Sequence, residues 1–482
     1  MTSKTVDQME MRFSRRAFLG GAMALAVWPC DLWGSSGNGT VSGIPPSVLS
    51  VWERPDGSAT DSVMVRRLYL DLAGRIPTKS EAQSYVGSKL PEKRARLVDT
   101  LLTSQEFADY WAMRFCDILR VKSEFPINLW PNAVYVYHAR VRSFVERNES
   151  WESFGRALLT SQGSNFRDAE VNFFRATDKR TPDGWAEAVA QTFLGIEPGV
   201  LGKKMRAELA SCLSNVRIKN THEWKEEIVY VDGEDRRADL CDRIFLHNRQ
   251  VVADAFLMRV RRWIFGPSAK FSTAKGTAIG GVKDVVRKIV MSSEYARGSV
   301  TGGFPARRLD AEVLDDAFCA LSDSRRNYQS PAPEPFTFLP PERSTVCIED
   351  GSISSGFLSL FGRPARDTGL MDERGRDVTA KQRLYLFNSG DLYRKITRVA
   401  LPAWKDAKGK INSYYTKPIA ARIEYLYWSF LSRAPSKHEI GVIMDEWRKR
   451  SDSGRNRRAK PGPLKQDVAW CLVNSKEFLY RI

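Results

Sequence analysis

Charged side chains gather within fifteen residues of the second half of the chain, shortly before Asn388. They include Arg363, Arg366, Asp367, Asp372, Glu373, Arg374 and Asp377. Arginine holds a planar carboxylate or sulfate through two parallel hydrogen bonds, and neighbouring carboxylates can transfer protons or bind a hard cation. The candidate ligand-binding residues are therefore Arg363, Arg366, Asp367, Arg374 and Asn388. The alternative is an internal network of ion pairs that pins a long loop to the helices.

Other familiar patterns for catalysis and metal binding are missing from the sequence. None of the four histidines stands in H-E-x-x-H or beside a cysteine, and no C-x-x-C occurs. The stretch Gly351–Gly356 lacks the G-x-S-x-G spacing of a nucleophile elbow, and Gly276–Lys283 has valine where a phosphate loop needs lysine. We therefore expect no covalent haem, no metal and no other cofactor, and the catalytic residues stay unknown.

Seven cysteines are spread widely along the chain. In an oxidising compartment, long-range disulfides can form between such distant thiols. Cys212 with Cys241 is the pair that we suggest for a disulfide, and buried free thiols are the alternative.

A helical pattern that could position these side chains occurs near both ends of the chain. From Arg66 the sequence reads R-R-L-Y-L-D-L-A-G-R-I-P-T-K-S-E, and from Glu424 it reads E-Y-L-Y-W-S-F-L-S-R-A-P-S-K-H-E. In each copy a proline ends one helix, and a capping box starts the next one by satisfying two backbone amides. The capping pairs are Thr78 with Glu81 and Ser436 with Glu439. Each copy closes on Ser-x-Glu-Phe, which is typical of a further helix start.

A fainter third copy extends from Phe265-Gly266-Pro267 to Ser292-Ser293-Glu294-Tyr295, without the capping glutamate. One hairpin cannot bury its own apolar face and must stack on another, so repeats of this kind build scaffold. Strand patterns are scarce, and residues 227–231 form one short candidate. The sequence therefore predicts a mainly α, multi-helical fold with duplicated helical hairpins near both ends and few short strands.

The chain divides into four predicted parts. A leader covers residues 1–36, an N-terminal helical domain 60–198, a middle segment with the third hairpin 199–300, and a C-terminal helical domain 301–482. The basic tract 448–463 interrupts the last hairpin, and a solvated loop or a polyanion contact would explain its composition.

Two adjacent arginines, Arg15 and Arg16, precede a short apolar run from Ala17 to Trp28. This arrangement is typical of a twin-arginine export signal, and the run is much shorter than the roughly 20 residues that a membrane-spanning helix needs. We therefore predict export by the twin-arginine route to the periplasm or cell surface, with no membrane span in the mature protein. A buried N-terminal helix is the alternative, but Arg15 and Arg16 would then need solvation beside it.

The net charge of +17 over 482 residues is strongly basic. The charges are dispersed among acidic residues along helical segments, so most should lie on solvated helix surfaces. Outside the cytoplasm, the remaining excess would attract anionic glycans, cell-wall polymers or lipid head groups. We therefore expect envelope proteins or anionic glycans as partners and no nucleic acid.

Several motifs resemble a known family. R-R-L-Y-L-D-L-A-G-R-I-P-T with L-L-T-S-Q-E-F-A-D-Y-W-A, and later F-L-S-L-F-G-R-P-A-R, L-Y-L-F-N-S and L-V-N-S-K-E-F, are similar to the paired N- and C-terminal domains of the planctomycete-type cytochrome c-associated family. The resemblance covers about residues 60–195 and 300–482, and it implies two domains of unknown function without established catalytic residues. Relatives place a C-x-x-C-H-type segment after the position of Gly195, where this chain continues with I-E-P-G, so the resemblance implies no haem here.

Two functions follow from these observations. The first is an exported helical scaffold or interaction protein that assists envelope enzymes handling anionic polymers. The second is a periplasmic enzyme, either a hydrolase or a redox partner without its own haem, with its site between Arg363 and Asn388.

Overall fold

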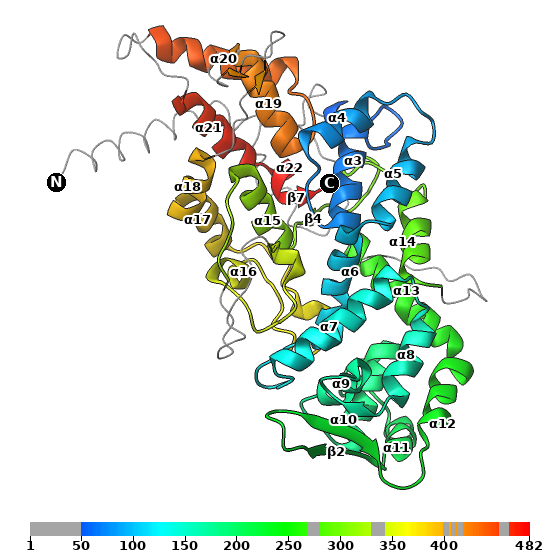
Figure 1. The fold of residues 1–482 in the computed structure, drawn as a ribbon. Coiled ribbons are helices and arrows are strands. Elements are labelled where there is room, and N and C mark those ends of the chain that lie inside the picture. Colours follow the sequence, from blue (N-terminus) through cyan, green and yellow to red (C-terminus); the bar gives the residue numbers. More distant parts are fainter. Residues whose placement is uncertain are drawn as a thin grey trace, which may run out of the picture.

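The computed structural model describes residues 50–267, 269, 280–328, 343–398, 404–405, 411–412, 418–452 and 462–482. Helices dominate this part of the chain, and the strands are few and short, so the predicted mainly α, multi-helical class is confirmed (Figure 1). Arg15 and Arg16 of the predicted export signal lie outside the described residues. None of the described helices is long and apolar enough to cross a membrane.

The first hairpin forms as its capping residues predict. Its elements are α3 (Asp61–Leu68), the π-helical turn η2 (Tyr69–Ala73), α4 (Lys79–Gly87), α5 (Lys93–Leu102) and α6 (Gln105–Ile118). Gly74 follows η2 with φ of +64°, and a Cβ atom there would lie 2.4 Å from the ring of Tyr110, so both the backbone and the packing require glycine. Thr78 and Glu81 form the predicted capping box at the start of α4.

The last hairpin repeats the first one down to individual hydrogen bonds. It consists of α19 (Ile419–Leu431), α20 (Lys437–Asp452), α21 (Gly462–Val473) and α22 (Lys476–Leu479). Arg75 donates to both oxygens of Glu81 at 2.8 Å, and Arg433 donates to both oxygens of Glu439 at 2.8 Å. The glutamate of Ser-x-Glu-Phe contacts the same arginine in each copy: Arg433 pairs with Glu477 at 2.7 Å, and Arg75 approaches Glu106 at 3.4 Å. We call each arginine with its two glutamates a clamp.

The third copy keeps two of these contacts. Its helices are α13 (Arg249–Phe265) and α14 (Val282–Met291), and part of the segment between them lies outside the described residues. Arg261 pairs with Glu294 at 2.7 Å. The hydroxyl of Ser292 accepts a hydrogen bond from the amide of Tyr295 at 3.2 Å, as Ser104 does from Phe107 in the first copy.

Between the first and third copies lie shorter helices and a small sheet, which occupy the lower part of Figure 1. The helices are α7 (Pro131–Glu146), α8 (Trp151–Thr160), η3 (Ala169–Val171), α9 (Asn172–Arg175), α10 (Pro182–Val189), η4 (Ala190–Leu194), α11 (Lys203–Cys212), α12 (Arg237–Cys241) and η5 (Asp242–His247). The sheet has the antiparallel order β1 (Gly163–Ser164), β3 (Glu227–Val231) and β2 (Val216–Asn220). The strand that the sequence predicts at 227–231 is β3.

Aromatic rings from four helices form the centre of the core. Phe115 of α6 contacts Phe144 of α7 and Trp263 of α13 at ring-centroid distances of 5.2 and 5.0 Å, and Trp151 of α8 stacks on Phe256 of α13 at 5.3 Å. Because such large rings bury much apolar surface, they hold α13 of the third copy against the first copy's α6.

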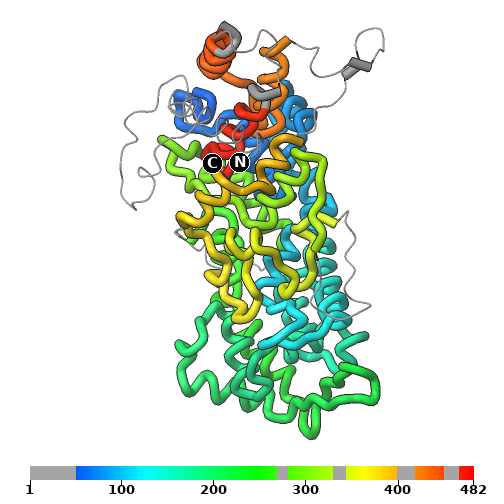
Figure 2. The backbone as a smooth tube through the Cα atoms, turned by 90° about the vertical axis from the view of Figure 1, so that its left-hand side faces the viewer, coloured from blue at the N-terminus to red at the C-terminus, as the bar shows by residue number. Residues whose placement is uncertain are grey.

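The second half of the chain packs against the first hairpin. Its elements are β4 (Arg307–Arg308), α15 (Ala311–Ser322), η6 (Thr345–Cys347), α16 (Gly356–Leu360), η7 (Met371–Glu373), α17 (Ala380–Asn388), α18 (Gly390–Thr397), β5 (Trp404–Lys405), β6 (Ile411–Asn412) and β7 (Tyr480–Arg481). β4 pairs with β7, and Arg67 of α3 donates to the carbonyl of Ile482 at 3.0 Å. In both views, the first and last hairpins therefore lie side by side at one end of an elongated molecule (Figures 1 and 2).

Cys212 and Cys241 are free, buried thiols, so the suggested disulfide is absent from the structure. Each sulfur lies in apolar packing at the end of its own helix, α11 or α12. Burial raises the pKa of Cys241 to about 11, which keeps this thiol protonated and slow to oxidise. The alternative of buried free thiols describes both residues.

The two equivalent clamps differ in burial, and this difference gives a test of their energetic roles. The Arg433 side chain is 5% exposed and that of Arg75 is 31% exposed. We expect Arg433→Ala to lower the free energy of unfolding by about 3 to 5 kcal/mol, because Glu477 stays buried without its partner. Arg75→Ala should cost about 1 kcal/mol or less, because water can solvate its exposed glutamates. Urea unfolding of both variants measures the difference, and equal losses would contradict this assignment.

Candidate functional site

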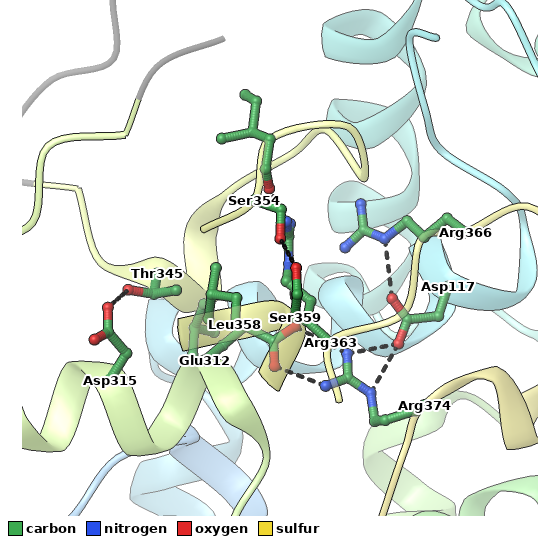
Figure 3. Close-up of polar contacts among 12 residues, drawn as sticks. Asp117, Glu312, Asp315, Thr345, Ser354, Leu358, Ser359, Arg363, Arg366 and Arg374 are labelled. Carbon is green, nitrogen blue, oxygen red and sulfur yellow. Dashed lines mark hydrogen bonds and ion pairs between the residues drawn. The ribbon is translucent and has the colours of Figure 1, made fainter. Parts of the chain in front are cut away.

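Three of the predicted ligand-binding arginines converge on two buried carboxylates (Figure 3). Arg374 donates to Asp117 of α6 at 2.7 Å and to Glu312 of α15 at 2.7 Å, so its guanidinium bridges the two acids. Arg366 donates to the other oxygen of Asp117 at 2.9 Å. Arg363 lies 3.3 Å from Glu312. We call these five residues the buried ion network.

Main-chain carbonyls satisfy further hydrogen bonds of the same arginines. Arg366 donates to the carbonyl of Glu349 at 2.5 Å, and Arg363 donates to the carbonyl of Asp350 at 3.2 Å. The residue Arg366 is only 1% exposed and has a φ of +62°. Burial alone would raise the pKa of Glu312, but Arg374 and Arg363 hold it below its usual value. The three arginines therefore have their partners inside the protein. This geometry corresponds to the internal network of ion pairs, which was the alternative to a ligand-binding site.

The other two predicted residues lie apart from this network. Asp367 forms an ion pair with Lys122 in the segment after α6. Asn388 is the last residue of α17 and is exposed, and within the described residues no hydrogen bond joins it to the three arginines. The structure therefore brings Arg363, Arg366 and Arg374 together and does not add Asp367 or Asn388 to them.

A second set of buried ion pairs joins residues that the sequence did not single out. Asp71 of η2 accepts from Arg481 at 2.8 Å and from Arg307 at 3.3 Å, and Asp310 accepts from Arg114 at 2.6 Å. Burial would raise the pKa of Asp310, but Arg114 and Arg307 hold it well below its usual range. These pairs link residues that lie 196 or more positions apart, so no local spacing could have revealed them.

An open cleft lies beside these networks, where the first hairpin faces α15. It has a volume of about 430 Å³. One wall comes from the turn after η2 and from α6, and the other comes from α15, η6 and the residues around them. Its lining residues include Arg75, Glu106, Asp109, Asp316, Cys319, Arg326, Arg343, Val346 and Cys347.

Asp316 is an acid of this cleft whose pKa lies near neutral pH. Its carboxyl oxygens accept from the backbone amides of Thr345 at 2.7 Å and Val346 at 3.1 Å, at the start of η6. Burial raises the pKa of Asp316 to about 7, although these hydrogen bonds oppose the shift. Asp316 can therefore exchange a proton near pH 7 in this cleft.

Two thiols also line the cleft. The ammonium of Lys395 donates to the sulfur of Cys319 at 2.8 Å and to the hydroxyl of Ser324 at 3.2 Å. Burial raises the pKa of the Cys319 thiol in spite of this contact, and it raises that of Cys347 to about 12. Both thiols are therefore poor nucleophiles at neutral pH.

Most charges around the cleft already have partners. Arg326 pairs with Asp315 at 2.6 Å, and Arg343 pairs with Glu349 at 2.5 Å. Among the described residues, no group of three His, Cys, Asp or Glu could hold a metal ion. The cleft thus offers a small cavity with apolar walls, one acid that titrates near pH 7, and a rim of paired charges.

Comparison with known families identifies two domains. Residues 51–204 match PSCyt2, a protein of unknown function (DUF1549), and residues 280–446 match PSD1, a protein of unknown function (DUF1553). The chain therefore contains both domains, in this order. The paired-domain resemblance read from the sequence is thereby confirmed. No curated protein and no solved structure matches the chain.

The family boundaries show that the buried ion network connects the two domains. Asp117 belongs to the PSCyt2 domain, whereas Glu312, Arg363, Arg366 and Arg374 belong to the PSD1 domain. The cleft also takes one wall from each domain. The network therefore docks the PSD1 domain onto the PSCyt2 domain, and the cleft is a feature of their junction.

The docking role of Arg374 can be tested by removing its guanidinium. We expect Arg374→Ala to lower the free energy of unfolding by about 3 to 5 kcal/mol, because Asp117 and Glu312 lose their shared cation while both stay buried. Arg383→Ala, an exposed arginine of α17, is the matched control and should change stability by less than about 0.5 kcal/mol. Thermal and urea unfolding measure both effects, and a stable Arg374→Ala protein would refute the docking role.

The titration of Asp316 predicts a dependence of stability on pH. Below its ordinary pKa of 3.8 the carboxyl is protonated in both states. As the pH rises from 3.8 through about 7, the unfolded chain releases its proton first, so the folded state loses roughly 2 to 4 kcal/mol. In Asp316→Asn this loss should disappear.

The measurement is the free energy of unfolding of wild type and variant at pH 4.5 and 7.5. Asp372→Asn, at an exposed position of η7, serves as the control and should follow the wild type. A difference between Asp316→Asn and wild type that stays constant with pH would contradict the raised pKa.

Proposed function

We propose that this protein is an exported helical scaffold or interaction protein that works beside envelope enzymes handling anionic polymers. The observation that carries the proposal is the buried ion network, because it uses the predicted ligand-binding arginines to hold two domains together. An arginine with two internal carboxylate partners stabilises a junction and is not free to bind a substrate. The twin-arginine pair Arg15-Arg16 supports delivery to the periplasm or cell surface.

The excess of positive charge supports an anionic partner. The chain has a net charge of +17, and several of its arginines are buried inside the protein. Exposed cations among the described residues, such as Arg217 and Lys219, attract polyanions in a manner that salt weakens.

Retention on a charged polymer tests this proposal. We expect the purified protein to bind dextran sulfate beads at low ionic strength, to elute as salt is raised, and to pass through uncharged dextran beads. Equal behaviour on the two polymers would refute an anionic partner. Export is checked separately, because replacing Arg15 and Arg16 by lysine should keep the protein in the cytoplasm of an expressing cell.

An enzyme is the second candidate, and the cleft is the observation that favours it. The expected site between Arg363 and Asn388 is occupied by internal ion pairs, so an enzymatic site would instead use Asp316, which exchanges a proton near pH 7. A hydrolase would shorten an anionic polymer with a pH profile that changes near 7, and Asp316→Asn would abolish this activity while Arg383→Ala would not. A polymer that stays intact favours the scaffold.

A further inference from the structure

Two aromatic side chains meet at the turn between β2 and β3, and β2 lies in the lower part of Figure 1. Trp224 in this turn is 55% exposed and contacts Trp130 with their ring centroids 5.2 Å apart. The ammonium of Lys225 lies 4.2 Å from the ring centre of Trp130. We call Trp130, Trp224 and Lys225 the hairpin tip. Solvent-exposed aromatic groups of this size mark binding surfaces more often than isolated exposed residues do.

The backbone holds the hairpin tip in an unfavourable conformation. Asn128, Trp130 and Lys225 have φ values of +58°, +68° and +64°, which non-glycine residues rarely adopt. Such conformations are energetically unfavourable and persist only where the surroundings enforce them. Here Arg175 donates to the carbonyl of Leu129 at 3.2 Å, which anchors the segment just before Trp130. The rings are therefore displayed on a fixed support.

Cations continue along the outer face of the same hairpin. Arg217 of β2 lies opposite Tyr230 of β3, and Lys219 places its ammonium 5.0 Å from the ring centre of Tyr230. Because residues two apart on a strand share a face, Arg217 and Lys219 point to the same side as Tyr230. This face therefore repeats the pairing of a lysine with an aromatic ring that the hairpin tip shows.

The acidic residues of the hairpin offset part of this charge. Glu227 pairs with Arg175 at 2.5 Å and with Arg180 at 3.1 Å, so its charge is neutralised within the protein. Glu226 accepts from the hydroxyl of Thr221 at 2.8 Å and also from Ser164, and these hydrogen bonds lower its pKa, so its carboxylate stays ionised. Glu223 is the exposed acid of the turn. The outer face thus presents Arg217 and Lys219 beside Tyr230, and the hairpin tip adds Lys225 beside Trp130 and Trp224.

We propose that the hairpin tip and the outer face of β2 and β3 form the binding site for an acidic polysaccharide. An indole ring covers the apolar CH face of a sugar, and a neighbouring ammonium binds its sulfate or carboxylate group. The two indole rings meet at an interplanar angle of 66°, so they cannot stack successive nucleobases in parallel as a single-strand platform does. The inference rests on the proposed function, because it names the surface and the chemical class for that function.

The experiment compares hairpin variants with matched controls on defined polymers. Trp224→Ala removes an exposed ring, and Leu384→Ala removes an apolar side chain that is 58% exposed on α17. Lys219→Gln removes a cation from the face, and Lys204→Gln makes the same change of charge on α11. Affinity electrophoresis measures the Kd for dextran sulfate, polygalacturonate, uncharged dextran and oligothymidylate. Thermal unfolding shows whether each variant keeps its fold.

We expect Trp224→Ala to weaken binding of the acidic polysaccharides by about tenfold and Lys219→Gln to reduce the salt dependence of binding. Both controls should bind like the wild type. If wild type binds the polysaccharides and Trp224→Ala and Lys219→Gln bind equally well, the site assignment is wrong while the proposed function stands. If wild type binds no acidic polysaccharide, the proposed function fails and the site with it. Tighter binding of oligothymidylate that Trp224→Ala abolishes would overturn the polysaccharide assignment in favour of nucleic acid.

Discussion

The rest of the structure depends on two ion pairs, which the guanidinium of Arg374 forms with Asp117 and with Glu312. A buried carboxylate is costly unless a cation and hydrogen bonds compensate for the lost water, and here one side chain does so for an acid of each domain. Arg374 reaches this position only when the loop between α16 and α17 lies against α6 and α15. The same requirement fixes α15 relative to the first hairpin, and these elements form the walls of the cleft.

The duplicated hairpins show how one local device serves two environments. Arg75 and Arg433 make matching bonds to a capping glutamate, yet Gly74 is replaced by Ser432 at the equivalent left-handed position. In the first copy Tyr110 of α6 packs against the turn and leaves no room for a Cβ atom. In the last copy α22 ends at Leu479 and the chain turns into β7, so the equivalent helix does not continue past the turn. Glycine is therefore needed only at the turn of the first copy, where the longer helix α6 places Tyr110 against the backbone.

Local features of the fold were predictable from sequence, whereas the site was not. The capping boxes, the paired hairpins and the strand at 227–231 depend on residues a few positions apart, and the sequence indicates each of them. Asp117 of α6, the partner that Arg366 and Arg374 share, lies some 250 residues away, so spacing along the chain gave no sign of it. Asp316 was missed for the same reason, because its unusual protonation comes from burial against η6 rather than from a motif. The predicted pairing of Cys212 with Cys241 was wrong, because nearness in sequence does not by itself bring two sulfurs into bonding distance.

The distribution of the arginines also changes the meaning of the net charge. Their dispersal among acidic residues indicated ordinary solvated helix surfaces, yet Arg67, Arg114, Arg366 and Arg481 are almost fully buried. Each of them donates to carboxylates or to main-chain carbonyls of distant segments, so these cations bind the chain to itself. A basic composition can therefore reflect arginines that join distant segments inside the protein, as well as surface cations that attract polyanions. The part of the charge that can recognise a partner is the part on exposed elements, and on the β2–β3 hairpin it occurs beside exposed aromatic rings. An anionic chain would find there both charge and an apolar surface, whereas the buried arginines have already exchanged water for partners inside the protein.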